Sequence, residues 1–530
     1  MLHTAMATRG MVVAPHHLAA EAGLRVLRDG GNAIEAMIAV ASTIAVVYPH
    51  MNALGGDNFW LVSEGGKPPV GIDACGAAAG LATSEFYAAN GHAEAIPARG
   101  PLAALTVAGV VSGWQAALEM STGWGGKLPL SRLLEDATFY AREGFPVTRT
   151  QAVNCAAKRD ELEASPGFVA TFMPDGAPPA IGAIFKNPRL GDTLQYLAKT
   201  GLDDFYRGDL ARSIAAELEA TGSPLRLADF ERHRARAVFP LTVRAASASV
   251  YGMPPPTQGL ASLMILGLYD RLPRAEAESF AHIHGLIEAT KQAFMVRDAH
   301  VTDPDYMTVN AQDYLQPAML DKFAARIDMD SAMPWPNVLD PGDTVWLGAI
   351  DSQGRAVSFI QSIYWEFGSG IVLPSTGILW QNRGTSFNLA PNSRNELKPF
   401  RRPFHTIQPA MAIFDDGRVM PYGTMGGDGQ PQTQAALFTR YAFYGQDLQT
   451  AVTAPRWLLG RTWGAPAMNL RLEKRFPPDL LIQLKNANHV IQVLGDFDEA
   501  LGHAGAIVRH NTGLMEGASD PRSDGSVAAY

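Results

Sequence analysis

Two runs of β-forming residues around a short turn constrain the fold of this chain most. Residues 344–350 and 356–362 are rich in Val, Leu, Ile and Phe, and they flank a turn at 351–355. This pattern predicts an antiparallel hairpin deep inside the chain. If the pairing is centred on the middle of the turn, Ser362 lies opposite Thr344, although a slip of one residue would break that match.

Thr344 opens the first run, directly after Gly342 and Asp343. A cut before Thr344 would leave a hydroxyl and a free α-amine on one residue. Such an amine can act as the general base for its own side-chain hydroxyl, so a single residue would supply nucleophile and base. A threonine after Gly-Asp is usually only the end of a turn. A catalytic interpretation therefore needs support from the rest of the sequence.

Composition indicates a large folded body without a nucleic-acid or metal signature. The 530 residues are 47% apolar and 18% charged, which allows an extensive core, and no linker or repeat divides them. A net charge of −9 argues weakly against a nucleic-acid partner. Cys75 and Cys155, the two cysteines, are too few for a disulfide framework or a zinc pair. Without an HExxH, phosphate-loop or GxSxG motif, we expect no metal and no cofactor.

We expect a cytoplasmic protein with no membrane contact. The longest apolar stretch, 36–47, is too short to span a bilayer and is better explained as a buried helix. The first residues also lack the charged and apolar regions of a signal peptide.

Apolar spacing and turn residues predict the other main elements. We expect helices at 17–28, 209–221 with Asp209 as N-cap, 279–300 and 430–444, a capping box at Asn32 and Glu35, and strands after Gly55-Gly56 and at 410–414 and 420–423. The expected core side of the helix at 279–300 consists of Ile283, Leu286, Ile287, Phe294 and Met295.

Several short motifs, in a fixed order, resemble the γ-glutamyltransferase family of N-terminal nucleophile (Ntn) hydrolases. In chain order they are Gly30-Gly31-Asn32-Ala33, Pro254-Pro255-Pro256-Thr257-Gln258-Gly259, Glu288-Ala289-Thr290-Lys291-Gln292-Ala293-Phe294, Arg297-Asp298, Asp303-Pro304, Gly342-Asp343-Thr344, Phe367-Gly368-Ser369-Gly370, Met425-Gly426-Gly427, Gln430-Pro431-Gln432, Ala454-Pro455-Arg456-Trp457 and Gly517-Ala518-Ser519-Asp520-Pro521-Arg522. Each motif alone is weak, but their order covers nearly the whole chain.

The resemblance implies an α+β fold, the αββα four-layer sandwich of the Ntn-hydrolase type. It implies one precursor that cuts itself between Asp343 and Thr344. The products would be a large subunit, 1–343, and a small subunit, 344–530, which together form one domain. The cleaved unit could also form a homodimer.

The resemblance also implies roles for individual residues. Thr344 would be the nucleophile, and Ser362 takes the place of a hydroxyl that bonds the new terminal amine. Gly426 and Gly427 match a glycine pair whose backbone N–H groups form the oxyanion hole, a task that suits glycine because the backbone must approach the substrate closely. Ser362 could instead be an ordinary strand hydroxyl, and the glycines could form a simple turn.

The chain departs from the family where relatives bind a glutamate head group. Cys75 stands in place of an arginine that grips the carboxylate, and a thiol cannot replace a guanidinium fork. Tyr364 replaces an asparagine, and Arg383 and Ser386 replace a glutamine and an aspartate that help hold the amine. His405 and Thr406 replace two serines. Arg383 could equally pair with a core carboxylate, and His405 could be a satisfied histidine beside a turn.

These changes favour a small amide that carries a carboxylate and lacks an α-amine. Arg383, His405, Thr406 and Tyr364 would bind it, and the resemblance makes oxamate the leading candidate substrate. Two alternatives remain open: hydrolysis or transfer of γ-glutamyl groups or of larger amides with the same chemistry, and an uncleaved relative that only binds a ligand.

Overall fold

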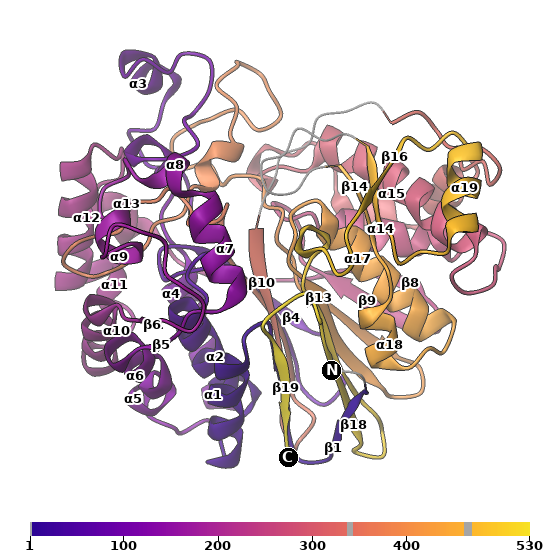
Figure 1. Cartoon of the computed structure of the whole chain (residues 1–530), viewed down its shortest axis with the longest axis horizontal. Coiled ribbons are helices and arrows are strands. Elements are labelled where there is room, and N and C mark those ends of the chain that lie inside the picture. Colours follow the sequence, from indigo (N-terminus) through magenta and orange to yellow (C-terminus); the bar gives the residue numbers. More distant parts are fainter. Residues whose placement is uncertain (1–2, 336–342, 461–468) are drawn as a thin grey trace.

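Two seven-stranded antiparallel sheets form the centre of the molecule (Figure 1). The computed structural model describes residues 3–335, 343–460 and 469–530. The hairpin sheet contains, in spatial order, β19 (Ser526–Ala529), β2 (Met11–Ala14), β10 (Asp343–Ile350), β11 (Ala356–Tyr364), β3 (Asp57–Ser63), β4 (Val70–Ala74) and β7 (Arg236–Val238). The opposite sheet contains β1 (Ala5–Ala7), β18 (Met515–Ser519), β17 (Ala504–Arg509), β13 (Val419–Thr424), β12 (Ala410–Phe414), β9 (Ala248–Gly252) and β8 (Leu241–Ala245).

Helices cover the outer face of each sheet. Over the hairpin sheet lie α1 (His17–Arg28), α2 (Ala33–Val47) and α4 (Val110–Gly123), and over the opposite sheet lie α14 (Gly259–Tyr269), α15 (Phe280–His300) and α17 (Gly429–Phe438). In Figure 1 the first group is indigo to violet and the second pink to orange.

Shorter elements surround this frame. The helices are α3 (Ser84–Ala89), α5 (Leu130–Leu133), α6 (Glu135–Glu143), α7 (Arg149–Ala157), α8 (Arg159–Leu162), α9 (Phe168–Phe172), α10 (Pro188–Thr200), α11 (Asp204–Arg207), α12 (Asp209–Thr221), α13 (Leu227–Arg232), α16 (Pro317–Ala324), α18 (Leu448–Thr453) and α19 (Pro478–Asn486). The strands are β5 (Phe145–Pro146), β6 (Ile184–Phe185), β14 (Trp457–Leu459), β15 (Leu470–Glu473) and β16 (Ile491–Leu494).

The buried apolar residues form three clusters that correspond to the interfaces between layers. One lies between the sheets and joins residues such as Phe59 and Trp346 to Met411 and Ile507. The other two lie between each sheet and its helices. Because both faces of the central strands are covered, β11 is buried at every position. This is the αββα sandwich that the family resemblance implies.

Trp346 anchors β10 between the sheets, two residues after Thr344. Its indole Nε1 donates to Ser358 Oγ at 2.9 Å. A Cβ at Gly423 would lie 2.2 Å from the indole Cδ1, and one at Gly505 would lie 2.5 Å from its Cζ3. The two glycines of the opposite sheet thus form a slot for the indole, and side chains there would push it out. The slot holds the start of β10 in register.

Most predicted elements are confirmed, with three corrections. The helix at 17–28, the capping box of Asn32 and Glu35 and the buried helix over 36–47 are present. Met295 is wrong as a core residue, since it is 36% exposed on the outer side of α15. Gly208, rather than Asp209, is the N-cap of α12, because Asp209 is already helical. The helix predicted at 430–444 changes to π geometry over Thr439–Phe443.

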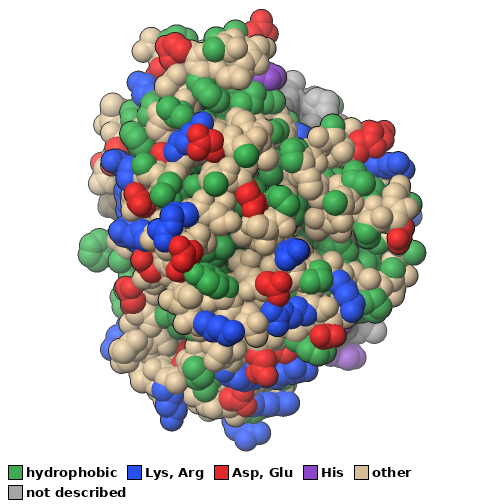
Figure 2. All heavy atoms as spheres, turned by 90° about the vertical axis from the view of Figure 1, so that its left-hand side faces the viewer, with side chains coloured by type: hydrophobic (Ala, Val, Ile, Leu, Met, Phe, Trp, Pro, Cys, Tyr) green, Lys and Arg blue, Asp and Glu red, His purple; other side chains and the backbone are tan. Residues whose placement is uncertain are grey.

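Basic and acidic side chains are interspersed on the face of the molecule formed by the N-terminal helices (Figure 2). Several form ion pairs, such as Arg142–Asp192 at 2.6 Å and Arg132–Asp29 at 2.7 Å, and exposed pairs of this kind contribute little stability each. Within the described ranges, no helix has both the length and the apolar character that a membrane span requires.

Candidate active site

Four neighbouring strands of the hairpin sheet bring polar residues together at one end. The β10–β11 ladder pairs Val345 with Gln361, as the sequence predicts, and its register shifts at the next position, Thr344. On β11, Ser362 pairs with Asp57 of β3. Cys75 follows β4 directly beyond the Asn58–Ala74 pair and so extends the same row. Thr344, Ser362, Asp57 and Cys75 therefore lie across consecutive strands.

The register shift beside Thr344 is built from Ser362 and Tyr364. The backbone N–H of Tyr364 donates to Ser362 Oγ at 2.8 Å, and Tyr364 has a φ of 82°. A left-handed conformation is unfavourable for a bulky residue by roughly 1–2 kcal/mol, so the surroundings must hold it. Tyr364 pairs with Asp343, whose backbone alone is described; Gly342 lies outside the described residues. The shift places both side chains beside Thr344, which is fully buried.

Gly426 and Gly427 connect β13 to α17 in a conformation that suits glycine. Their φ angles are 117° and 50°. The Gly426 carbonyl accepts from Gly429 N at 2.7 Å, and that of Gly427 accepts from Gln430 N at 3.2 Å. In the part of the chain that the structure describes, neither glycine N–H donates to a backbone acceptor. Two N–H groups at the start of a helix are thus available to a negatively charged atom.

A buried polar network holds this glycine loop. Gln258 Nε2 donates to the Gly427 carbonyl at 2.7 Å and also to the Thr406 carbonyl. Arg297 donates to Gln258 Oε1 at 2.8 Å and to Asp428 Oδ1 at 2.7 Å. Gln258 and Arg297 belong to sequence motifs that had no assigned role. Their contacts show that both motifs position the glycine pair.

Replacing Gln258 with leucine is expected to destabilise the protein by about 1–3 kcal/mol, because two buried carbonyls lose their donor. Urea denaturation would measure the change. Gln312→Leu is the matched control, since its amide donates to the Thr242 carbonyl at 2.9 Å nearer the surface; we expect a change within about 0.5 kcal/mol. Equal losses in the two variants would contradict the assignment.

Gln430 is a site residue that the sequence analysis did not identify. Its Nε2 donates to Thr344 Oγ1 at 3.3 Å, and its Oε1 accepts from Gln408 N at 3.1 Å. It lies in the first turn of α17, so it connects the glycine loop to Thr344. The sequence did hold a clue to this role, since Gln430 follows the glycine pair by three residues. A residue in the first turn of a helix lies close to any group that the N-terminus of the helix binds.

Arg383 lies on the other side of Tyr364, in the short 3-10 helix η4 (Arg383–Ser386). Its guanidinium carbon is 3.6 Å from the centre of the Tyr364 ring. Its NH2 donates to Thr406 Oγ1 at 3.2 Å and its NH1 to the Phe404 carbonyl at 3.4 Å. With only 1% of its surface exposed, Arg383 places a positive charge inside the site. The contacts run from Thr344 through Gln430, Gly427, Gln258, Thr406 and Arg383 to Tyr364. They close into a ring because the backbone of Tyr364 pairs with that of Asp343, the neighbour of Thr344.

His405 is bonded to Asp57. The distance from His405 Nε2 to Asp57 Oδ2 is 3.1 Å, and both side chains are buried. Burial raises the pKa of the Asp57 carboxyl to about 7, against the opposing effects of the Gly76 N–H and the Arg383 charge. Burial, followed by the charge of Arg383, holds the pKa of His405 well below its usual value, so the imidazole is neutral. Asp57 is the second site residue that the sequence analysis did not identify.

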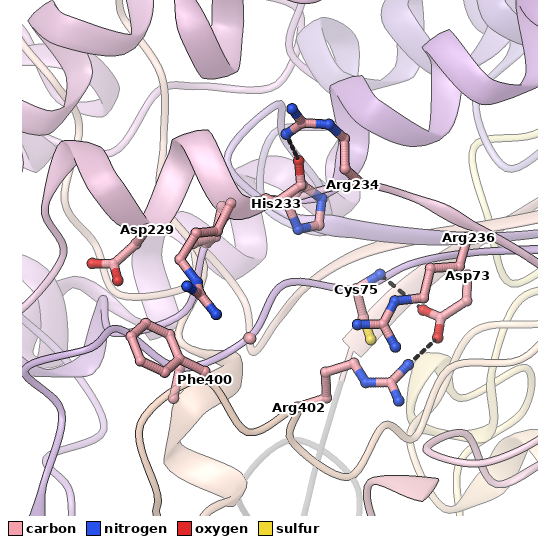
Figure 3. A pocket seen from close by; sticks show the side chains of 12 residues that line it. Asp73, Cys75, Asp229, His233, Arg234, Arg236, Phe400 and Arg402 are labelled. Atoms are coloured by element: carbon pink, nitrogen blue, oxygen red, sulfur yellow. Dashed lines mark hydrogen bonds and ion pairs between the residues drawn. The ribbon is translucent and has the colours of Figure 1, made fainter. Parts of the chain in front are cut away.

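Cys75 marks the outer end of the row, at the floor of a pocket of about 120 Å³ (Figure 3). Burial raises the pKa of the Cys75 thiol well above its usual value, so it is a poor nucleophile. Its neighbour Asp73 accepts from Arg402 at 2.8 Å, and Arg402 also donates to Asp303 at 2.9 Å. Arg232, Arg234 and Arg236 line the pocket with exposed side chains, as does Phe400, so the charge that it presents is positive.

One side-chain group among the described residues has the composition of a metal site. His284, Glu288 and His489 offer ligand atoms within 4.8 Å of one another, between α15 and the C-terminal part of the chain. However, Lys291 Nζ lies 2.6 Å from Glu288 Oε1, and His284 Nδ1 lies 2.8 Å from His489 Nε2. The lysine ammonium already neutralises the carboxylate, and a second cation would be repelled.

The structure brings the predicted site residues together. Thr344, Ser362, Tyr364, Gly427, Thr406 and Arg383 belong to one contact network, Gly426 adjoins it, and His405 reaches the row of strand residues through Asp57. Ser386 donates instead to the Phe404 carbonyl at 3.2 Å. The site also contains a buried acid, Asp57. Its Oδ1 accepts from Gly76 and Gly109 at 3.0 Å each, and its Oδ2 faces His405.

Comparisons with known proteins agree over the whole chain. The sequence model of the gamma-glutamyltranspeptidase family matches residues 19–530. The chain is 55% identical to the oxamate amidohydrolase proenzyme of Klebsiella pneumoniae, over 99% of each chain. It is 39% identical to the glutathione hydrolase-like YwrD proenzyme of Bacillus subtilis, again over 99% of each. The crystal structure of cephalosporin acylase from Bacillus halodurans superposes with a TM-score of 0.92 at 35% identity, covering 100% of this chain and 97% of that one.

Proposed function

Since this chain belongs to the gamma-glutamyltranspeptidase family, we propose that it is a self-processing threonine amidohydrolase that converts oxamate to oxalate and ammonia. The observation that carries the proposal is the closed ring of contacts in which Thr344, the glycine loop and the buried Arg383 meet. The 55% identity to a proenzyme named for this substrate supports it. The ring brings together what a carboxylated amide needs: a nucleophile, donors for an oxyanion and a fixed positive charge.

The first reaction is cleavage of the chain itself. Thr344 Oγ1 attacks the carbonyl carbon of Asp343, the 343–344 C–N bond breaks, and an ester forms in its place. Water then hydrolyses this ester, which yields the large subunit 1–343 and the small subunit 344–530 with a free α-amine on Thr344. Gln430 Nε2 already holds the hydroxyl at 3.3 Å, and Ser362 lies at the next strand position to bond the new amine.

Hydrolysis of the substrate then repeats the same chemistry. Thr344 Oγ1 attacks the amide carbon and its own α-amine takes the proton. The N–H groups of Gly426 and Gly427 stabilise the oxyanion, a contribution worth about 10²–10³ in rate for one donor in other enzymes. The C–N bond breaks, the proton passes to the nitrogen, and ammonia leaves. Water hydrolyses the oxalyl ester, releases oxalate and restores the hydroxyl.

Binding depends on the residues that differ from the family pattern. Arg383 and Thr406 offer donors to the substrate carboxylate. Tyr364, held under the guanidinium, limits the space available. Asp57 does not provide a site for an α-amine, because Gly76, Gly109 and His405 already bond both of its oxygens. The site therefore favours a small anion without an amine over a γ-glutamyl group.

The test compares three amides with one preparation of purified protein. We expect intact mass to show two pieces, 1–343 and 344–530, and oxamate to yield oxalate and ammonia in equal amounts. A γ-glutamyl anilide and a glutaryl amide of a cephalosporin nucleus should react far more slowly. A preference for either of these two amides would overturn the assignment of oxamate as the substrate. A chain that folds but is uncut and inactive would overturn the proposal that the protein is an enzyme. The homodimer of the cleaved unit and the cytoplasmic location stay predictions.

A further inference from the structure

The further inference rests on the proposed function and concerns what Asp57 does for His405. Three contacts fix the His405 ring. Its Nε2 lies 3.1 Å from Asp57 Oδ2, and the ring packs in a T-shape against Phe59 with ring centres 5.1 Å apart. Its backbone N–H donates to the Pro256 carbonyl at 2.9 Å, and its carbonyl accepts from Gln258 N at 3.0 Å. A ring held in this way cannot flip without breaking a buried hydrogen bond.

The contacts of Asp57 determine which nitrogen of His405 carries the hydrogen. Asp57 Oδ1 accepts from the backbone N–H groups of Gly76 and Gly109, which leaves Oδ2 facing the imidazole. The pKa of Asp57 is about 7, so above that pH its carboxylate is ionised and only accepts, and Nε2 must donate. Because the imidazole is neutral, Nδ1 keeps a lone pair. Within the described residues, Nδ1 is buried and has no hydrogen-bond partner.

An unpaired acceptor in a buried site is unfavourable unless a ligand donates to it. A carboxylate has no hydrogen to donate, whereas the NH2 group of a primary amide has two. Arg383, whose NH2 bonds the residue next to His405, offers the complementary partner for the carboxylate. The two ends of oxamate thus match two different groups of the site.

We propose that Asp57 is a positioning residue that fixes the tautomer of His405, so that Nδ1 accepts a hydrogen bond from the primary amide of the substrate. His405 then selects amides over esters of the same size, because an ester oxygen at that position has no hydrogen to donate. Asp57 itself does not touch the substrate.

Asp57→Asn tests this assignment with little change in shape. The asparagine oxygen can keep the Gly76 and Gly109 bonds, and its NH2 group then replaces Oδ2. Nε2 must become the acceptor and Nδ1 the donor, which reverses the preference of the site. At pH 8.5, above the Asp57 pKa of about 7, we would measure kcat/KM for oxamate and for monomethyl oxalate. The ratio of amide to ester should fall by roughly ten- to a hundred-fold.

A second variant and a control separate this role from general damage. His405→Phe keeps a flat ring against Phe59 and removes both ring nitrogens, so the same ratio should fall. Asp351→Asn changes a buried carboxylate in the turn at the far end of β10 and should leave the ratio unaltered. Intact mass would verify self-cleavage of each variant.

Each outcome decides a separate point. A ratio within twofold of wild type in both Asp57→Asn and His405→Phe overturns the inference and leaves the proposed function standing. If neither variant cuts itself, Asp57 and His405 are needed for self-cleavage, and the inference is also overturned. Wild-type protein that cuts itself and hydrolyses neither compound overturns the proposed function, and the inference with it.

Discussion

Replacing Thr344 with alanine is expected to leave one uncut chain of 530 residues and to abolish release of ammonia from oxamate. Both reactions use the same oxygen atom, which the substitution removes. No other described hydroxyl has the position of Thr344 at the start of β10, beside Gln430 and the glycine loop. The rate should fall on the order of 10⁴-fold or more, as it does when a nucleophile is removed from other acyl-transfer enzymes.

Two controls make this result specific. Thr344→Ser keeps the hydroxyl and should still cut itself. Thr43→Ala removes a threonine that is equally buried in α2, and whose hydroxyl has no partner in the described structure; it should behave as wild type in both assays. Two pieces of the expected masses from the Thr344→Ala protein would mean that another residue carries out the cleavage.

Replacing Arg383 with methionine is the change that should affect oxamate binding most. The guanidinium is the charged donor within the contact ring, and a charge-assisted hydrogen bond to a carboxylate is worth about 1.5–3 kcal/mol. We therefore expect kcat/KM for oxamate to fall by roughly 10- to 150-fold. Most of the change should appear in KM, since the carboxylate contact is present before and during the reaction. Intact mass would establish that the methionine variant has cut itself before its rates are compared with those of the wild type.

Oxamide, which replaces the carboxylate of oxamate with a second amide, is the matched substrate. Its kcat/KM should change by less than about threefold in the methionine variant if charge recognition is the cause. Arg99→Met is the matched variant, because Arg99 also lies over an aromatic ring, Trp365, at 5.4 Å, and donates to backbone carbonyls. It should not alter the ratio of oxamate to oxamide. A parallel loss on both substrates in the Arg383 variant would indicate damage to packing.

Local patterns allowed the hairpin and the glycine loop to be predicted. The pairing of Val345 with Gln361 follows from the turn length alone, and the special φ angles of Gly426 and Gly427 explain why glycine occurs there. Both depend on interactions between residues close in the chain. The order of motifs supplied the rest of the fold through family resemblance.

Asp57 and Gln430 could not be assigned in this way, because their roles depend on contacts made over long separations. Asp57 meets His405 across 348 positions of the chain, and Gln430 reaches Thr344 across 86. The register shift beside Tyr364 was also missed, since periodicity assumes a regular ladder. Met295 was misplaced because α15 is buried on most of its surface, which leaves little helical periodicity to read.

The order of strands in the two sheets has a consequence for the cut protein. If the chain is cut before Thr344, strands of the small piece alternate with strands of the large one: β2 lies between β19 and β10, β11 pairs with β3, β18 with β1, and β12 with β9. Neither piece could leave without opening both sheets along these ladders. Each molecule would therefore keep, for its whole lifetime, the partner with which it was synthesised. Pieces would not be traded between molecules, and a molecule that failed to cut itself could not be repaired by its neighbours.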